Sequence, residues 1–498
     1  MTDALDQLKQ RLTEIGDLGS IARLLSWDQQ TIMPPAGAGI RAEHRATLGR
    51  LAHERFVSDD TARLLEAVRP LEESLDPESD DACLIRVVRR DFDKARRVPA
   101  DLRAEMARSA AQAFPVWSRA KARSDFAAFL PVLEHNIELR MRYVECFEPA
   151  DEPYDILLDD YEPETSTAAV REVFEEIKAS LVPAVRGLAD ADTDADFLTG
   201  DYPVERQVGL VNEVVELLGM RPASWRLDPT EHPFASGAGI DDVRITTHYD
   251  PHGLDAIFST VHEYGHGLYN HQLPGRLARL PVGASCSLGI HESQSRLWEN
   301  LVGRALPFWR FFYPRVQEVF PEQLADVELE RFLPAINQPR RSFIRIHADE
   351  LTYGLHVILR FELEQDIVNG RVAVRDLPEA WNAKIGEYLG LEVPDDARGV
   401  LQDVHWSAGM VGYFPTYLLG TVMSVQIWQR VLADVPDLEE QIERGEFAAL
   451  REWLGEHVHA LGRKFPPQET LRRAVGSTID AKPYLAYLDA KYGLGVAA

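Results

Sequence analysis

The sequence predicts one large all-α unit with a minor β-sheet, and three observations support this fold class. Apolar residues recur every three or four positions through most of the 498 residues, which is the spacing of an amphipathic helix. Segments that alternate polar and apolar residues, as strands do, are scarce. No internal repeat is visible, and no stretch is long or biased enough in composition to be a disordered linker. We therefore expect a single domain over residues 1–498.

The helical pattern can be followed along the chain in order. It covers residues 1–25, 40–68, 80–94, 101–146, 166–187, 203–218, 322–333 and 344–368. The last segment runs into Asn369-Gly370, a pair typical of a helix C-terminus. Breaks are predicted at residues 33–39, 188–203 and 389–399, where proline, glycine or acidic residues gather.

Residues 404–429 resemble a membrane span in one respect, because they contain no Asp, Glu, Lys or Arg over a sufficient length. The segment nevertheless holds His405, several hydroxyl side chains, glycines and Pro415, which lipid would accommodate poorly. We expect a buried core helix that is entered through a loop, and no membrane partner.

Composition excludes other classes of function. The chain has 53 basic and 80 acidic residues, a net charge of −27, so binding to nucleic acid or to anionic lipid is disfavoured. Three widely spaced cysteines argue against a disulfide framework and against a cysteine-ligated zinc. The first residues mix charged and apolar side chains without a secretory pattern. A cytoplasmic location is the expectation.

The stretch FSTVHEYGHGLYNH, residues 258–271, carries the first indication of chemistry. In a helix, His262 and His266 lie on one face and can direct both imidazoles at one metal ion, with Glu263 beside it as a base. This is the HExxH pattern of zinc peptidases, in which the metal activates water and the glutamate takes its proton. The pentad is short enough to arise by chance, since the chain has 15 histidines.

The best strand pattern, residues 242–250, alternates and is rich in β-branched residues immediately before that helix. An edge strand beside a metal helix could pair with an extended peptide substrate, so this order suits a peptidase.

A catalytic zinc usually has three protein ligands, so a third is needed downstream. Residues 287–306 predict a second helix that begins near His291 and Glu292. Glu292 follows His266 by 26 residues, which is enough for a loop and an antiparallel return. His291 and Glu299 are alternative ligands, and Glu292 could instead be an ordinary carboxylate favoured by the helix dipole.

Further motifs extend the pattern over nearly the whole chain. They are HPF at 232–234, DxRxT at 242–246, HExxH at 262–266, HES at 291–293, IRxxAD at 344–349 and GxxQDxHW at 399–406, with LLSWDQQTIMPPAG at 24–37 and YDILLDDYEPE at 154–164. In this set and order the chain resembles the metallocarboxypeptidases of peptidase family thirty-two, the thermostable carboxypeptidase 1 (Taq-type) family.

The resemblance implies a saddle-shaped, neurolysin-like helical zincin with a deep groove that is closed at one end. Helices within about residues 1–110 would cap the groove, and the enzyme would be a homodimer. The implied ligands of one Zn²⁺ per chain, for which Co²⁺ can substitute, are His262, His266 and Glu292, with Glu263 as general base. The implied activity is the removal of single C-terminal amino acids from peptides, with broad specificity.

Hydrolysis at the C-terminus of a peptide also requires donors to the oxyanion that forms during the reaction and a group that binds the free carboxylate of the substrate. His405 and Tyr413 are the preferred oxyanion donors, with Tyr417 as a further substrate contact, although both tyrosines could simply pack in the core.

His232 is a candidate contact to the substrate backbone. Arg345 is preferred as the anchor of the substrate carboxylate, because a guanidinium donates two parallel bonds. Arg244 is the second candidate, and the family places it toward the closed end of the groove. A helical ion pair between Arg345 and Asp349 is the alternative interpretation.

Two other functions stay open. The same scaffold could serve an oligopeptidase or a dipeptidyl carboxypeptidase, which would release longer fragments. A non-enzymatic peptide-binding protein is disfavoured, since the metal and base residues are all present.

Overall fold

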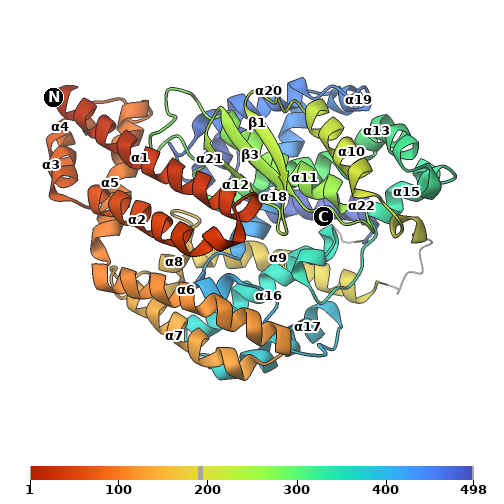
Figure 1. Ribbon diagram of the computed structural model, residues 1–498, viewed down its shortest axis with the longest axis horizontal. Coiled ribbons are helices and arrows are strands. Elements are labelled where there is room, and N and C mark those ends of the chain that lie inside the picture. The colour runs from red at the N-terminus through yellow and green to blue at the C-terminus, as the bar shows by residue number, and fades with distance from the viewer. Residues whose placement is uncertain (1, 189–194, 496–498) are drawn as a thin grey trace.

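Helices carry most of the chain in the computed structural model, which describes residues 2–188 and 195–495 (Figure 1). The first helices are α1 (Thr2–Thr31), α2 (Ala38–Phe56), α3 (Asp59–Ala67), α4 (Arg69–Glu72), α5 (Asp80–Arg97), α6 (Ala100–Arg123), α7 (Phe126–Val144), α8 (Pro153–Leu158), α9 (Thr167–Arg186) and α10 (Val204–Leu217), with 3-10 turns η1 (Pro35–Gly37) and η2 (Asp196–Leu198). Three strands follow, β1 (Trp225–Pro229), β2 (Ala235–Gly239) and β3 (Asp242–Thr247).

The second half of the chain is helical again. It contains α11 (Asp255–His271), α12 (Leu288–Arg296), the π-helical turn η3 (Leu297–Val302), α13 (Leu306–Val319), α14 (Pro321–Leu324), α15 (Leu329–Ile336), α16 (Glu350–Val368), α17 (Leu377–Leu389), α18 (Pro415–Asp434), α19 (Leu438–Glu443), α20 (Ala448–His457), α21 (Pro467–Val475) and α22 (Ala481–Tyr492). Its 3-10 turns are η4 (Arg345–His347), η5 (Val374–Asp376), η6 (His405–Ala408) and η7 (His459–Leu461). The predicted all-α class with a small sheet is confirmed.

Several predicted helices divide or begin later than their patterns indicate. The pattern over 101–146 is two helices, because Ser124 has a left-handed conformation (φ 52°) and the Asp125 side chain caps α7. The pattern over 344–368 becomes helical only at Glu350, since the Asp349 carboxylate accepts the backbone N–H groups of Leu351 and Thr352. Apolar periodicity continues through such breaks when the flanking residues face the same core.

Residues 242–247 form a strand within the predicted range 242–250, but its expected place at the edge of the sheet is wrong. β3 lies in the middle of the sheet, parallel to β1 and antiparallel to β2, in the order β1-β3-β2. Both sides of its backbone are therefore paired within the protein. Alternation reports which face of a strand is buried, but not which strands lie beside it.

Residues 404–429 form a loop and the buried helix α18, as predicted. Most positions of α18 are buried around its full circumference, which explains the absence of charged side chains. Within the described residues, no helix is both long and apolar enough to cross a membrane.

The buried apolar residues form a main core and a smaller one under the N-terminal helices. The small core contains leucines of α1 and residues up to Phe92 of α5, whereas Val98 and Leu102 belong to the main core. The loop between α11 and α12 completes the small core with Leu277 and Val282. Helices α1 to α5 thus pack around a core of their own, and the loop between α11 and α12 contributes to this core.

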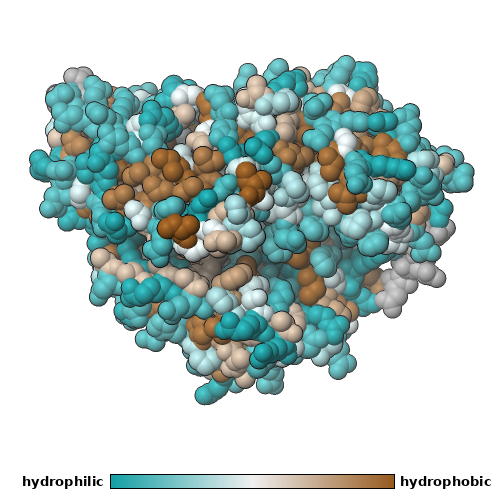
Figure 2. Space-filling model, in the orientation of Figure 1, coloured by the Kyte–Doolittle hydropathy of each residue, from teal (hydrophilic) through white to brown (hydrophobic). Residues whose placement is uncertain are grey.

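Figure 2 shows that the visible face is hollowed along a band across its middle. The part that contains α1, α2 and the sheet lies on one side of this band, and the part that contains α6 and α7 lies on the other (Figure 1). Within the first part, β3 packs on α11, and α11 packs on α12.

Candidate metal centre

Two helices bring the HExxH and HES residues together. α11 carries His262 and His266 one turn apart, and α12 carries Glu292. α12 begins three residues before the predicted position, because the Ser287 side chain accepts the N–H of Ile290 and caps it. The buried carboxylate of Glu162 also accepts the N–H of Gly289 in the first turn.

Glycines let these helices approach closely. A Cβ on Gly265 of α11 would lie 2.5 Å from the carbonyl oxygen of Gln294, so only glycine permits this contact with α12. On the opposite side of α12, a Cβ on Gly420 of α18 would lie 2.6 Å from the Cβ of Glu292. Close backbone contacts therefore fix the position of α12, and with it the backbone of Glu292.

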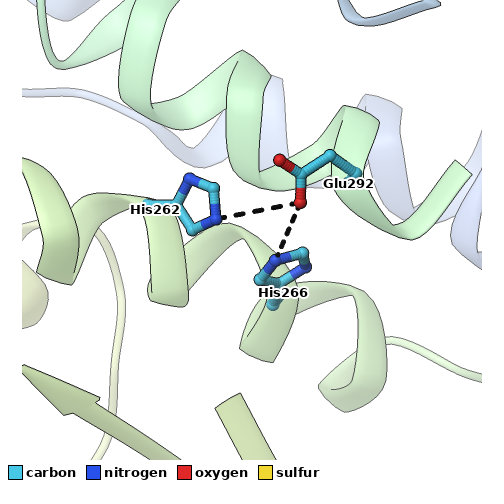
Figure 3. A group of neighbouring side chains, drawn as sticks. All are labelled: His262, His266 and Glu292. Atoms are coloured by element: carbon cyan, nitrogen blue, oxygen red, sulfur yellow. Dashed lines mark ion pairs between the residues drawn. The ribbon is translucent and has the colours of Figure 1, made fainter. Parts of the chain in front are cut away.

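The three predicted ligands face one another (Figure 3). Oε2 of Glu292 lies 3.4 Å from Nε2 of His266 and 3.9 Å from Nε2 of His262. One ligand atom from each of the three residues lies within 4.8 Å of the others. Tetrahedral ligands at zinc distances are separated by about 3.4 Å, so this donor set fits a divalent ion.

The second nitrogen of each imidazole is already engaged. Nδ1 of His262 lies 2.8 Å from Oε2 of Glu299, and Nδ1 of His266 lies 3.1 Å from the carbonyl oxygen of His291. Each Nδ1–H donates to its oxygen acceptor, which leaves the Nε2 lone pair directed at the site. Such partners determine the tautomer that a metal requires.

The two alternative ligands occupy other places. His291 stacks on the ring of His266, with 4.4 Å between centroids, and its Nε2 lies 3.4 Å from the amide oxygen of Asn270. Glu299 contacts the Nδ1 side of His262, away from the cluster of Nε2 and Oε2 atoms. Of the three candidates that the sequence left open, Glu292 is the one that joins both Nε2 atoms.

Glu263 is a buried acid in the same turn of α11. It is 6% exposed, and its Oε2 has no hydrogen-bond partner among the described residues. Burial raises the pKa of Glu263 above its ordinary value, and the two nearby imidazoles oppose that change. An unpartnered carboxylate beside three metal-ligand atoms is the arrangement that a general base requires.

An aromatic cluster beside the site contains His405 of η6, Tyr413 of the following loop and Tyr417 of α18. Nε2 of His405 lies 3.1 Å from the Tyr417 hydroxyl, and the rings of His405 and Tyr413 are 5.2 Å apart. Burial lowers the pKa of His405 to about 3, so this imidazole is neutral. Burial and the negative charge of Glu292 raise the pKa of Tyr413, which keeps its hydroxyl protonated as a donor.

Arg345 lies in the turn η4 and not on a helix with Asp349, so the predicted alternative ion pair between them is wrong. Two of its nitrogens donate to Oδ1 of Asp403, at 3.1 and 3.0 Å, and a third donates to the Tyr353 hydroxyl at 3.0 Å. Oδ2 of Asp403 accepts from Arg360 at 2.6 Å. Two buried guanidinium groups thus share one carboxylate.

The two remaining candidates lie in or next to the sheet. Arg244 on β3 pairs with Asp242 at 2.7 Å, and its guanidinium lies 4.1 Å from the ring centroid of Trp27 on α1. His232 is exposed in the loop between β1 and β2. The structure therefore gives Arg244 a clear role in joining α1 to the sheet, and it does not bring His232 into the metal cluster.

Sequence reasoning missed Glu162, Arg296 and Tyr353. Arg296 follows Glu292 by four residues, a spacing that could have indicated their ion pair. Glu162 and Tyr353 carry no local signal, because their partners lie far away in the sequence.

Comparisons with known proteins show a family match over almost the whole chain. The sequence model of the family described as carboxypeptidase Taq (M32) metallopeptidase matches residues 7–492. Thermostable carboxypeptidase 1 of Thermus thermophilus is 40% identical over 505 residues, covering 98% of each chain. Carboxypeptidase 1 of Bacillus subtilis is 36% identical over 485 residues, covering 97% of this chain and 96% of that protein. The crystal structure of an M32 carboxypeptidase from Deinococcus radiodurans R1 has a TM-score of 0.94 and 40% identity, with 99% of each chain covered.

Proposed function

Since the chain belongs to the carboxypeptidase Taq (M32) family of metallopeptidases, we propose that it is a zinc-dependent carboxypeptidase that removes single C-terminal amino acids from peptides with broad specificity. One observation carries the proposal: three ligand atoms converge beside the unpartnered carboxylate of Glu263. A binding protein without catalysis would have no need for a buried base at this position.

His262 and His266 would hold the ion through Nε2, and Glu292 through Oε2. When bound, the metal supplies activation of a water molecule and polarisation of the scissile carbonyl. Glu263 takes a proton from this water and later delivers it to the leaving amine nitrogen, so one side chain acts as base and then as acid.

His405 and Tyr413 are the proposed donors to the oxyanion that forms on the carbonyl. Both are neutral donors in a buried cluster, where a hydrogen bond to developing charge contributes more than it does in water. Tyr417 contacts His405 and would orient its ring. His232 is exposed, and its proposed contact to substrate would require a peptide that extends along the β1–β2 loop.

Arg345 is the proposed anchor for the terminal carboxylate. Arg345 and Arg360 together carry one more positive charge than the Asp403 that they share, and this excess would attract a carboxylate. The fork of Arg345 is already engaged, so we expect attraction through charge rather than a free bidentate pair. Arg244 is the weaker candidate, because its charge is balanced by Asp242, with which it forms two hydrogen bonds.

Metal analysis combined with a digestion assay tests the proposal. Purified protein should contain about one divalent ion per chain, and Co²⁺ should restore activity after chelation. A peptide with a blocked N-terminus should give a ladder of single-residue losses from its C-terminus by mass spectrometry, and the same peptide with an amidated C-terminus should be a poor substrate. Release of dipeptides or internal fragments would instead show a dipeptidyl carboxypeptidase or an oligopeptidase. Absence of both metal and cleavage would overturn the proposal.

Two further features stay predictions that follow from the family. We expect a homodimer, to be measured by the sedimentation of purified protein, and a cytoplasmic location.

A further inference from the structure

Arg296 connects two carboxylates at the metal centre. Its Nε donates to Oε1 of Glu292 at 2.8 Å, and its Nη1 donates to Oε2 of Glu299 at 3.2 Å. The three residues are spaced four and three apart along α12 and the π-helical turn η3, so their side chains can meet on one face. All three are largely buried, with 9–16% of each side chain exposed.

Each carboxylate has a different task. Glu292 presents its other oxygen, Oε2, to the Nε2 atoms of His262 and His266. Glu299 accepts the Nδ1–H of His262 through the same oxygen that accepts from Arg296. Arg296 therefore contacts one proposed ligand directly, and it also contacts the group that orients another ligand.

We propose that Arg296 is a positioning residue of the metal centre, which restricts Glu292 to a single ligating oxygen and holds Glu299 against His262. This inference rests on the proposed function, because it assumes that the site binds a divalent ion. The hydrogen bond from Arg296 draws Oε1 of Glu292 toward the guanidinium and so favours ligation through Oε2 alone. One-oxygen ligation keeps the remaining coordination positions for water and substrate.

The surroundings hold the guanidinium in place. Its plane lies over the ring of Tyr353, with 4.5 Å from Cζ to the centroid, and the hydroxyl of this tyrosine accepts from Arg345. On the other side, Nη2 of Arg304 lies 3.6 Å from Oε1 of Glu299. A planar fork with five donors can serve two carboxylates at once, whereas a lysine ammonium is a single point that cannot span both in the same way.

If Arg296 acted only through its positive charge, its removal would have the opposite effect on metal affinity. A cation close to a divalent ion repels it, so removal of that charge should tighten metal binding. A positioning role means that removal loosens Glu292 and Glu299 and weakens binding. Because the two effects differ in sign, the metal affinity of a variant distinguishes them.

The test compares Arg296→Gln and Arg296→Lys with the native protein. Affinity for Co²⁺ is measured by competition with a chelator, and the visible spectrum of the Co²⁺ protein reports the coordination number. We expect about 10–100-fold weaker binding for Arg296→Gln, in the range found when partners of metal ligands are removed. We expect weaker binding for Arg296→Lys as well, although it keeps the charge. A weaker visible band in both variants would show the extra ligating oxygen of Glu292.

Arg473 offers a matched control, because it also bridges two glutamates, at 2.7 Å to Glu469 four residues earlier and at 2.6 Å to Glu78. Arg473→Gln should bind Co²⁺ like the native protein. Circular dichroism without metal identifies loss of folding, and if Arg296→Gln does not fold, the result for Arg296→Lys decides.

Native affinity, or tighter binding, in a folded Arg296→Gln would overturn the inference, as would native affinity and spectrum in Arg296→Lys. A native protein that binds no Co²⁺ would instead overturn the proposed function, so the two failures are distinguishable.

Discussion

Replacement of Gly265 by alanine should separate the two helices of the metal centre. The added Cβ would lie 2.5 Å from the Gln294 carbonyl oxygen and 2.7 Å from the Ser295 Cα, whereas ordinary contact begins at 3.4 Å. Both neighbours are backbone atoms of α12, so no side chain can rotate away. The helices must move apart by about 0.9 Å, the difference between these contact distances.

That displacement would move the proposed ligand Glu292 relative to the two histidines, because Glu292 lies within one turn of Gln294 on α12. Metal sites tolerate about 0.2 Å in ligand distances, and misplacement of reacting groups by about 1 Å can cost 10²-fold in rate. Overpacking costs typically about 1–3 kcal/mol of stability. We expect Gly265→Ala to lower the unfolding free energy by that amount and to weaken metal binding at least about tenfold.

Metal competition and chemical denaturation measure both effects. Gly209 on α10 is the matched control, since it is an exposed helical glycine with open space around its Cβ position. Gly209→Ala should stabilise the protein by about 0.5–1 kcal/mol, the usual gain from alanine in a helix. If Gly265→Ala were as stable as the native protein and bound metal with native affinity, the close backbone contact would not control the site.

Three further changes have defined outcomes. Glu263→Gln should retain the metal and lose about 10²–10⁴-fold in kcat, since an amide cannot take a proton from water, and near-native turnover would exclude its role as a base. Burial raises the pKa of Glu162 to about 8, so this acid stabilises the fold most at low pH and loses that contribution as pH rises through about 8. The Tm of native protein should therefore fall from pH 5 to 8.5 relative to Glu162→Gln, which has no titrating group and still accepts from Gly289, and parallel pH profiles would contradict this. Leu277→Ala should lower the unfolding free energy by about 2–5 kcal/mol and speed proteolysis within α1–α5, because this 2%-exposed side chain fills the core of those helices. Leu306→Ala, at a 36%-exposed position, should have little effect. Equal proteolysis of the two variants would show that the loop containing Leu277 does not stabilise α1–α5.

Some of the site could be predicted because it depends on local geometry. The spacing of His262 and His266 determines that both imidazoles lie on one face, whatever the helix packs against. The uncharged segment that became α18 had to be buried, since only the core or a membrane accepts such a helix and its hydroxyl groups and glycines exclude lipid. The resemblance in motifs then extended this local information to the whole chain.

Other features depended on neighbours that the local pattern does not contain. The alternation of residues 242–250 predicted a strand but not its place in the sheet, where β1 and β2 pair with both sides of β3. Arg345 and Asp349 have the spacing of a helical ion pair, yet Asp349 caps α16 and Arg345 pairs with Asp403 instead. An Asp side chain can bond to the backbone at a helix terminus instead of to another side chain, and spacing alone does not show which partner it takes.

The third metal ligand depends both on the local sequence and on the packing of distant segments. Residues 287–306 alone supply His291, Glu292 and Glu299 as candidates on one helix, and their order in the chain does not distinguish them. The packing of α12 does, and its closest backbone neighbours include Gly265 of α11 and Gly420 of α18, which lie elsewhere in the sequence. The spacing in the sequence determined only that a helical pair of histidines needs a third ligand, and the resemblance to the family pointed to Glu292. Tertiary packing supplies the physical reason why Glu292 faces the histidines, because a helix of about 3.6 residues per turn presents each candidate in a different direction and its neighbours determine which direction meets α11.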